Sequence, residues 1–198
     1  MAREKKPAEK RVTRPAKPKP AGKARKPPTR KAKTAINQSA TNPARIYTLD
    51  VSLLSGPITK AFAKRNRSVV RTIQIRGDQT LEQLHDCIFA AFDRDDPHMY
   101  EFQLGKGPMD PKGPQYVLSV AADEDFGPPV AGTVDGTTLD RMGLEVGRQF
   151  GYWFDFGDDW QHQIGVVKVE AGTGDGEYPR VVKRVGASPP QYVDEDEG

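Results

Sequence analysis

The stretch that decides the fold is FGYWFDFGDDWQHQI, which runs from Phe150 to Ile164. Six of the sixteen aromatic residues of the chain fall in the first eleven positions of this stretch. An aromatic side chain removes about 150–250 Å² from water when it is buried. So much apolar surface is unstable in water, so this stretch is expected to form part of a hydrophobic core.

The aromatic residues of this stretch alternate, which is the period of a β-strand. The sequence Gly157-Asp158-Asp159 follows them and is typical of a turn. We therefore expect a hairpin of residues 150–156 and 160–169. Trp153 and Asp155 are expected on the opposite face, which makes Trp153 the candidate exposed aromatic. The core face is expected to carry Phe150, Tyr152, Phe154 and Phe156.

Regular elements are also predicted upstream of the hairpin. Alternating apolar residues at 46–54 and β-branched residues at 69–75 predict two strands. Thr80 and Gln83 fit a capping box, and the apolar residues after them recur at helical spacing as far as Phe92. Shorter strands are expected at 99–104 and 116–120, and one helical turn at 138–142. The order predicts an α+β fold with a mixed, mostly antiparallel sheet and one main helix, a β-grasp-like ββαββ core followed by the C-terminal aromatic hairpin.

The charge of the chain is divided unevenly. Residues 1–34 hold 14 of the 30 lysines and arginines but only two of the 27 acidic residues, so the rest of the chain has 16 basic against 25 acidic residues. The first segment has no aromatic residue and six prolines, a composition that does not form a core. We expect a disordered basic tail at 1–43, one domain at 44–192 and an acidic tail at 193–198.

The composition also excludes several classes of protein. Cys87 is the only cysteine, so an intrachain disulfide and a cysteine-rich zinc site are excluded. No apolar stretch reaches the roughly 20 residues of a membrane span, and the basic N-terminus lacks the apolar segment of a secretory signal. We expect a cytoplasmic protein without a membrane partner, and a nucleoid-associated one if the tail binds DNA.

Four motifs occur together and carry a resemblance to a known family. They are LEQLHD at 81–86, DDPHMYEF at 95–102, YWFDFGDDWQH at 152–162 and SPP at 188–190. The pattern resembles the plasmid pRiA ORF-three-like family, whose members also bear a transposon-associated or TnpR-like label, and it covers residues 46–192. The resemblance implies a bacterial α+β domain and defines no activity. Many members have cysteines around the Pro-Pro pair, where this chain has Ser188 and Gln191-Tyr192-Val193.

Recombinase chemistry, which the label suggests, is not supported by the residues. A serine recombinase needs a serine activated beside arginines, and the single candidate, Ser68, lies in a basic connector. A tyrosine recombinase needs a His-x-x-Arg element, and none of the three histidines has an arginine three residues later. We therefore expect a protein that is not an enzyme and has no cofactor.

The histidines leave one enzymatic alternative open, because all three lie next to acidic residues. If the end of the helix met the hairpin turn, nitrogen and oxygen ligands would surround a divalent metal that activates water for hydrolysis. The spacing matches no compact ligand motif, and aspartates are also what a turn favours. The candidate ligand or metal site consists of Asp96, His98, Asp155, Asp158 and His162.

The basic tail gives the clearest indication of a partner. Flexible cations neutralise phosphates and release counterions without reading bases, so the tail predicts non-specific nucleic-acid association. We expect a binding domain linked to mobile elements, with a metal-dependent hydrolase and a module for an unidentified protein partner as alternatives. The nucleic-acid-binding residues are expected to be Lys5, Lys6, Lys10, Arg11, Arg14, Lys17, Lys19, Lys23, Arg25, Lys26, Arg30, Lys31 and Lys33.

Overall fold

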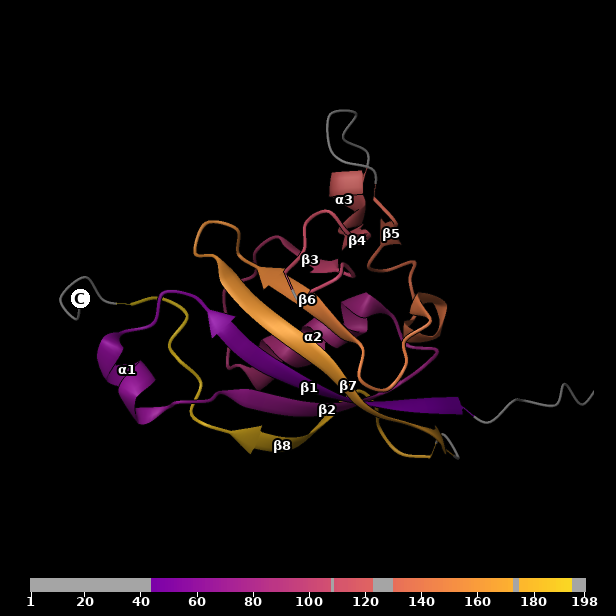
Figure 1. The fold of residues 1–198 in the computed structure, drawn as a ribbon, viewed down its shortest axis with the longest axis horizontal. Coiled ribbons are helices and arrows are strands. Elements are labelled where there is room, and N and C mark those ends of the chain that lie inside the picture. Colours follow the sequence, from indigo (N-terminus) through magenta and orange to yellow (C-terminus); the bar gives the residue numbers. More distant parts are fainter. Residues whose placement is uncertain (1–43, 108, 123–129, 173–174, 194–198) are drawn as a thin grey trace, which may run out of the picture. The chain divides into compact units, whose positions relative to one another are not determined.

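The aromatic hairpin lies in the middle of an eight-stranded sheet (Figure 1). The computed structural model describes residues 44–107, 109–122, 130–172 and 175–193, so the predicted basic tail and residues 194–198 lie outside the described residues. The elements in chain order are β1 (Ala44–Ser55), α1 (Lys60–Arg65), β2 (Val70–Arg76), α2 (Leu81–Ala91), β3 (Tyr100–Gln103), β4 (Gln115–Val117), α3 (Ser119–Ala122), β5 (Gly132–Thr133), the 3-10 helix η1 (Leu139–Met142), β6 (Gln149–Phe154), β7 (Trp160–Gly172) and β8 (Arg180–Val185).

The strand order confirms the predicted α+β class. The order is β5-β4-β3-β6-β7-β1-β2-β8, and of these neighbouring pairs β4 and β5 are the parallel one. The hairpin β6–β7 is not added at an edge of the ββαββ core. Instead β6 pairs with β3 on one side, and β7 pairs with β1 on the other. The hairpin therefore joins β3-β4-β5 to β1-β2-β8.

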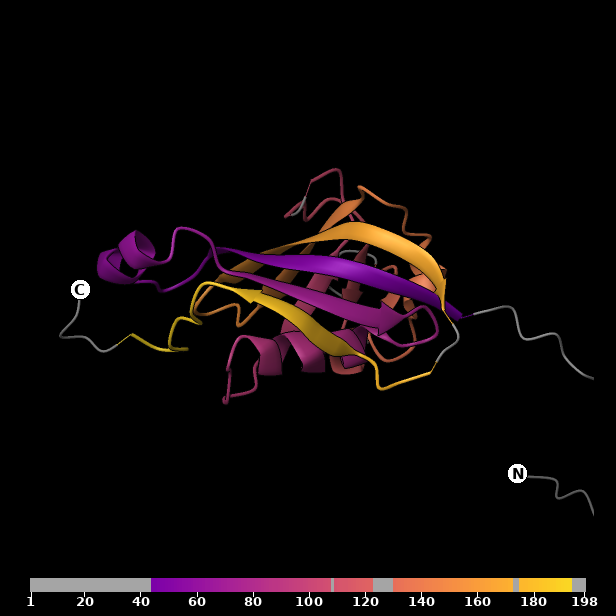
Figure 2. The same cartoon turned by 90° about the horizontal axis from the view of Figure 1, so that it is seen from below.

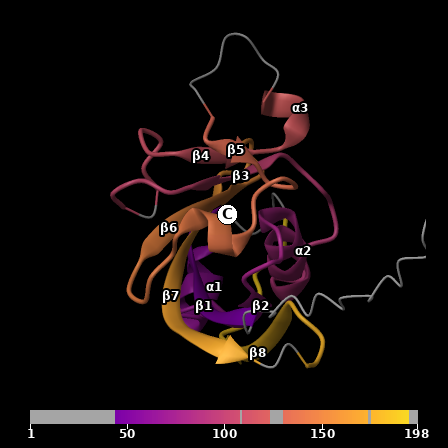
Figure 3. The same cartoon turned by 90° about the vertical axis from the view of Figure 1, so that its right-hand side faces the viewer.

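The sheet curves around helix α2, which lies within its concave side (Figure 3). The predicted capping box begins this helix, since the Thr80 hydroxyl oxygen accepts from the Gln83 amide at 3.2 Å and Gln83 Oε1 accepts from the Thr80 amide at 2.9 Å. The apolar stripe that follows is buried. Its partners in the core include Tyr47, Ile73, Phe102, Phe150, Tyr152 and Phe154.

The predicted alternation of buried and outward-facing residues is correct for most of the first hairpin strand and wrong at its end. Phe150, Tyr152 and Phe154 are buried, whereas Phe156, which was predicted on the same face, is 41% exposed. The reason is the backbone at Asp155, whose φ of 53° ends the extended conformation after Phe154. Trp153 is half-buried rather than exposed, and its ring packs 4.5 Å from that of Phe156.

Three short elements were not predicted. Strand β8 lies at the sheet edge next to β2 (Figure 2). Helix α3 begins inside the strand predicted at 116–120, and that strand ends at Val117 instead. Strand β5 has no predicted counterpart, and residues 123–129 before it lie outside the described residues. In the described part of the chain, no helix is both long enough and apolar enough to cross a bilayer.

The first residue of β7, Trp160, is completely buried. A Cβ atom built on Gly56 would lie 2.2 Å from Cε3 of the Trp160 ring. The backbone after β1 therefore approaches the indole so closely that any larger residue would overlap it. The guanidinium of Arg94 lies over the same indole, with its carbon 3.5 Å from the ring centroid.

Replacement of Gly56 by alanine tests this packing. Gly56→Ala is expected to lower the free energy of unfolding by about 1–3 kcal/mol, because the added methyl overpacks the core. Urea unfolding followed by tryptophan fluorescence measures the change. Gly165→Ala is the matched control, since a Cβ at Gly165 in β7 meets nothing within 4 Å. Equal midpoints for the two variants would contradict the proposed contact.

Candidate functional site

The loop that follows α2 carries several of the candidate residues, and its path is set by the end of the helix. Asp93 adopts a left-handed φ of 55°. The Asp93 amide donates to the Ala90 carbonyl at 3.2 Å, and the Arg94 amide donates to the Phe89 carbonyl at 3.1 Å. This pair of bonds is the Schellman arrangement, with aspartate in the place that glycine usually takes. It turns the chain at Asp93 and directs Arg94 toward Trp160.

The hairpin turn runs from Asp155 to Asp159, two residues longer than predicted. The Asp155 carboxylate organises it, since Oδ1 accepts from the amides of Gly157 at 3.2 Å and Asp158 at 3.3 Å. The Asp155 carbonyl accepts from the Asp159 amide at 2.7 Å, and the Asp155 amide donates to the Met99 carbonyl at 2.9 Å. Asp155 is 6% exposed, so its first role is to cap this turn and tie it to the residue before β3.

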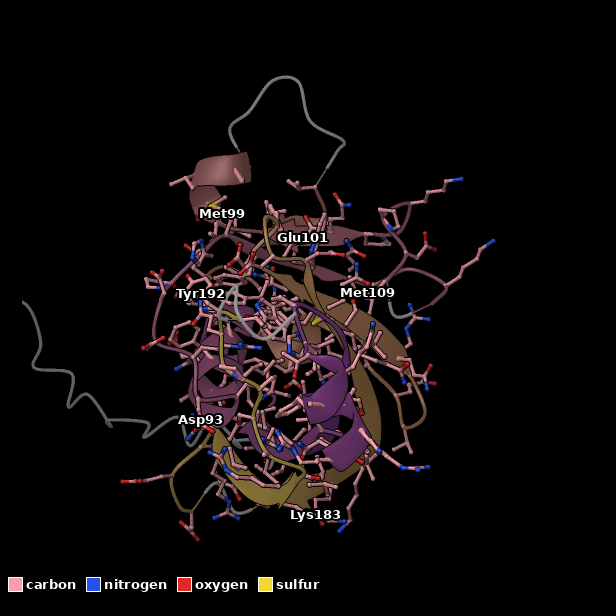
Figure 4. The ribbon with its side chains drawn as sticks, turned by 90° about the vertical axis from the view of Figure 1, so that its left-hand side faces the viewer. Asp93, Met99, Glu101, Met109, Lys183 and Tyr192 are labelled. Carbon is pink, nitrogen blue, oxygen red and sulfur yellow. The ribbon has the colours of Figure 1, made fainter. Side chains whose placement is uncertain are left out.

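Residues 187–193, which we call the strap, contact the loop after α2 through Gln191 and Tyr192. Figure 4 labels Tyr192 in the strap and Asp93 at the start of the loop. Gln191 is 5% exposed, and its Oε1 accepts from the amides of Asp95 at 3.1 Å and Asp96 at 3.2 Å. Its Nε2 donates to the Asp96 carbonyl at 2.8 Å. The Tyr192 hydroxyl then donates to Asp96 Oδ2 at 2.6 Å. The strap therefore fixes both the backbone and the carboxylate of Asp96.

Four side chains meet at the surface end of this loop, and we call them the exposed cluster: Asp96, His98, Asp155 and Tyr192. His98 Nε2 is 2.9 Å from the Tyr192 hydroxyl oxygen and 3.5 Å from Oδ2 of both Asp96 and Asp155. The hydrogen bond to Asp96 raises the pKa of Tyr192 to about 12, and the same bond lowers the pKa of Asp96. At neutral pH the cluster therefore holds an ionised carboxylate and a protonated phenol.

His162 lies in the interior instead. It is 1% exposed and packs edge-on against Phe92, with ring centroids 4.9 Å apart. Burial, helped by the charge of Arg94, lowers the pKa of His162 to about 3. We call Arg94, Trp160 and His162 the buried cluster, because Arg94 lies on Trp160 and is close enough to affect the ionisation of His162.

His85 is also a structural residue. Its Nδ1 is 2.7 Å from the Tyr152 hydroxyl oxygen, and its ring stacks on Tyr100 with centroids 3.5 Å apart. Burial lowers the pKa of His85 to about 4. His85 is therefore a neutral part of the core.

The structure thus divides the five predicted ligands. Asp96, His98 and Asp155 come together, Asp158 contributes its amide to the turn, and His162 is buried beside Phe92. Within residues 44–107, 109–122, 130–172 and 175–193, no group of three or more His, Cys, Asp or Glu side chains is arranged to hold a metal ion.

Sequence reasoning missed Arg94, Gln191 and Tyr192. Arg94 had one local signal, because it is the lone cation in the acidic run Asp93-Arg94-Asp95-Asp96 directly after an apolar helix. Gln191 and Tyr192 are separated from Asp96 by 95 and 96 residues, and nothing in the local sequence indicates that contact.

Comparisons with known proteins match the part of the chain that contains both clusters and the strap. The family model described as plasmid pRiA4b ORF-3-like protein matches residues 59–198. The chain belongs to this family. The matched residues include both clusters and the strap, and they begin after β1, so the resemblance seen in the sequence motifs is confirmed.

Two further proteins are similar to this chain. An uncharacterised protein, y4hQ, from Sinorhizobium fredii is 27% identical over 128 residues, which are 63% of this chain and 59% of that protein. The chain thus matches less than two thirds of the length of that relative. A crystal structure of a protein of unknown function from Methanosarcina mazei Go1 has a TM-score of 0.52 and 25% identity, covering 71% of this chain and 70% of that one. Neither description gives an activity.

The two buried histidines predict a pH dependence of stability. The unfolded chain takes up protons as the pH falls below 6.5, whereas folded His85 and His162 do not until about pH 4 and about pH 3. Their contribution to stability is complete above pH 6.5 and is lost as the pH falls through this window. Each histidine is expected to give a slope of about 1.4 kcal/mol per pH unit within it.

Urea unfolding between pH 7.5 and 4.5 measures this slope. His162→Leu is expected to lower the slope by about 1.4 kcal/mol per pH unit, the contribution of one proton. Leucine keeps the apolar contact with Phe92 and binds no proton. Carboxylates titrate in both the wild type and the variant. The difference between the two slopes is therefore the contribution of His162. Parallel stability curves for wild type and variant would show that His162 is not buried as a neutral base.

Proposed function

We propose that the protein is a non-enzymatic binding domain whose basic N-terminal tail attaches it to nucleic acid without reading sequence. The observation that carries the proposal is the charge division of the chain, in which 14 of the 30 basic residues occur in the first 34 positions with only two acidic ones. The remaining chain is acidic overall, so it repels phosphates and leaves the tail as the principal contact.

The exposed helix α1 offers a second basic contact. It has no buried residue, and Lys60, Lys64 and Arg65 are all exposed. Thr59 caps the helix, accepting from the Phe62 amide at 3.1 Å, so these three cations are held on an ordered element. An exposed basic surface on an ordered helix is suited to backbone contacts with DNA or RNA.

Two of the three histidines and Tyr192 are unsuited to acid–base chemistry near neutral pH. General acids and bases work best when their pKa lies near the working pH. The pKa of Tyr192 is about 12, while those of His85 and His162 are about 4 and about 3. The family description names a plasmid reading frame, which fits a protein that acts near mobile DNA.

Binding of unrelated DNA duplexes by the full-length chain, measured by fluorescence anisotropy across salt concentrations, tests the proposal. Neutralising the thirteen lysines and arginines from Lys5 to Lys33 with glutamine is expected to weaken binding about tenfold or more at low salt, and to flatten the dependence on salt, because fewer counterions are released. An unchanged affinity together with an unchanged salt slope would refute the role of the tail.

The contribution of α1 is measured in the same assay. The triple variant Lys60→Gln, Lys64→Gln, Arg65→Gln is expected to weaken binding by a smaller factor than the tail variant, since it removes three charges. The matched control neutralises three exposed lysines on other elements, Lys106, Lys112 and Lys168. If both triple variants lose the same affinity, α1 makes no specific contact.

A further inference from the structure

Buried polar atoms without a hydrogen-bond partner are concentrated in the buried cluster. In the part of the chain that the structure describes, five of the seven such side-chain atoms belong to Arg94, Trp160 and His162. They are both terminal nitrogens of Arg94, the indole nitrogen of Trp160 and both ring nitrogens of His162. Folded proteins rarely leave such atoms unpaired. The backbone of Tyr152 and Trp160 interacts with the His162 ring, so the unpaired nitrogens that indicate a recognised group are those of Arg94 and Trp160.

The three side chains share one place in the fold. Trp160 and His162 are two residues apart on β7 and therefore face the same side of the sheet. Their cross-strand neighbours on β6 are Phe154 and Tyr152. Arg94 comes from the loop after α2, is 7% exposed, and has its guanidinium carbon 3.5 Å from the centroid of the Trp160 ring.

A second buried arginine shows what a purely structural role looks like in this protein. Arg71 is 1% exposed, and its Nε donates to the Ala91 carbonyl at 2.9 Å. Its Nη1 donates to the carbonyls of Val70, Val185 and Gly186, and its Nη2 donates to the Ser188 hydroxyl at 2.8 Å. Among the described residues, the terminal nitrogens of Arg94 have no comparable acceptors.

The nearest acidic side chains do not fill this role. Asp155 and Asp158 act on Arg94 through their charge. Asp155 Oδ1 is already bound by two turn amides, and Oδ2 faces His98. Burial lowers the pKa of Arg94 to about 10, so its guanidinium remains a buried cation at neutral pH.

We propose that the buried cluster binds a small carboxylate through Arg94 and Trp160. The terminal nitrogens of Arg94 form a planar fork that matches the two oxygens of a carboxylate. The indole N–H of Trp160 adds a third donor. A singly charged group fits better than a dianion such as sulfate, because Asp155 and Asp158 lie nearby and repel additional negative charge.

The position of the cluster limits what enters. The five atoms are closed off from solvent, so a carboxylate reaches them only after a surrounding segment moves. The 155–159 turn and the strap, which bind residues within 95–99, are the segments whose movement opens the cluster. The hydrogen bond from Tyr192 to Asp96 holds the strap on this loop.

The two tryptophans of the chain provide a readout with an internal control. In a proton–nitrogen correlation spectrum of the full-length, nitrogen-15-labelled protein, each indole N–H gives one peak, and Trp153→Phe assigns them. Titration with formate or acetate, at an ionic strength held constant with chloride, is expected to move the Trp160 peak downfield to saturation. The Trp153 peak is expected to stay in place.

Arg94 variants separate recognition from folding. Arg94→Met removes the fork and the charge but keeps an apolar chain over Trp160, and it is expected to weaken binding about tenfold or more. Arg94→Lys keeps the charge without the fork and is expected to bind with intermediate affinity. An acetylated dipeptide with a free C-terminus is compared with acetate, and the tighter ligand identifies the source of the carboxylate.

The proposal is overturned if the Trp160 peak does not move to saturation with any of these carboxylates in the wild-type protein, a result that needs no variant. It is also overturned if Trp153 moves equally, if Arg94→Met binds as well as wild type, or if sulfate binds as tightly as acetate. The experiment is independent of nucleic-acid binding, so its outcome does not depend on the tail.

Discussion

The structure depends on the backbone pairing of the hairpin β6–β7 with strands on both of its sides. Without it, β3 and β1 have no contact through the sheet, because β6 and β7 are the strands between them. The aromatic residues of the hairpin then supply the core beneath α2. One element thus provides both the hydrogen bonds that connect the sheet and much of the apolar surface that covers the helix.

The same hairpin shows how much of the fold could be predicted from the sequence. Alternation predicts the face of Phe150, Tyr152 and Phe154 correctly, because extended backbone has a period of two. It is wrong at Phe156, because the left-handed backbone of Asp155 ends the strand first. The capping box at Thr80 was readable because both partners are local. Strand β5 has two residues, too few for a periodic signal.

In the candidate site, too, contacts between residues close in the sequence could be predicted better than contacts between distant ones. Asp96 and His98 are two residues apart, and the sequence groups them with Asp155 only if the end of the helix meets the hairpin turn, a condition that the structure fulfils. The position of Gln191 and Tyr192 could not, because it depends on a contact across 95 residues or more. The contrast between Arg71 and Arg94 was also hidden, since a sequence does not show which cations find acceptors after burial.

The central place of the hairpin has a consequence for the order in which the protein assembles. During synthesis β1, β2, α2, β3 and β4 leave the ribosome before either strand of the hairpin. Until then the edges of β1 and β3 that face the hairpin have no partner, and unpaired strand edges promote association between chains. Completion of the sheet requires contacts between residues more than 100 positions apart, and such topologies fold slowly. The nascent chain is therefore most vulnerable to aggregation just before Phe150 to Ile164 emerge.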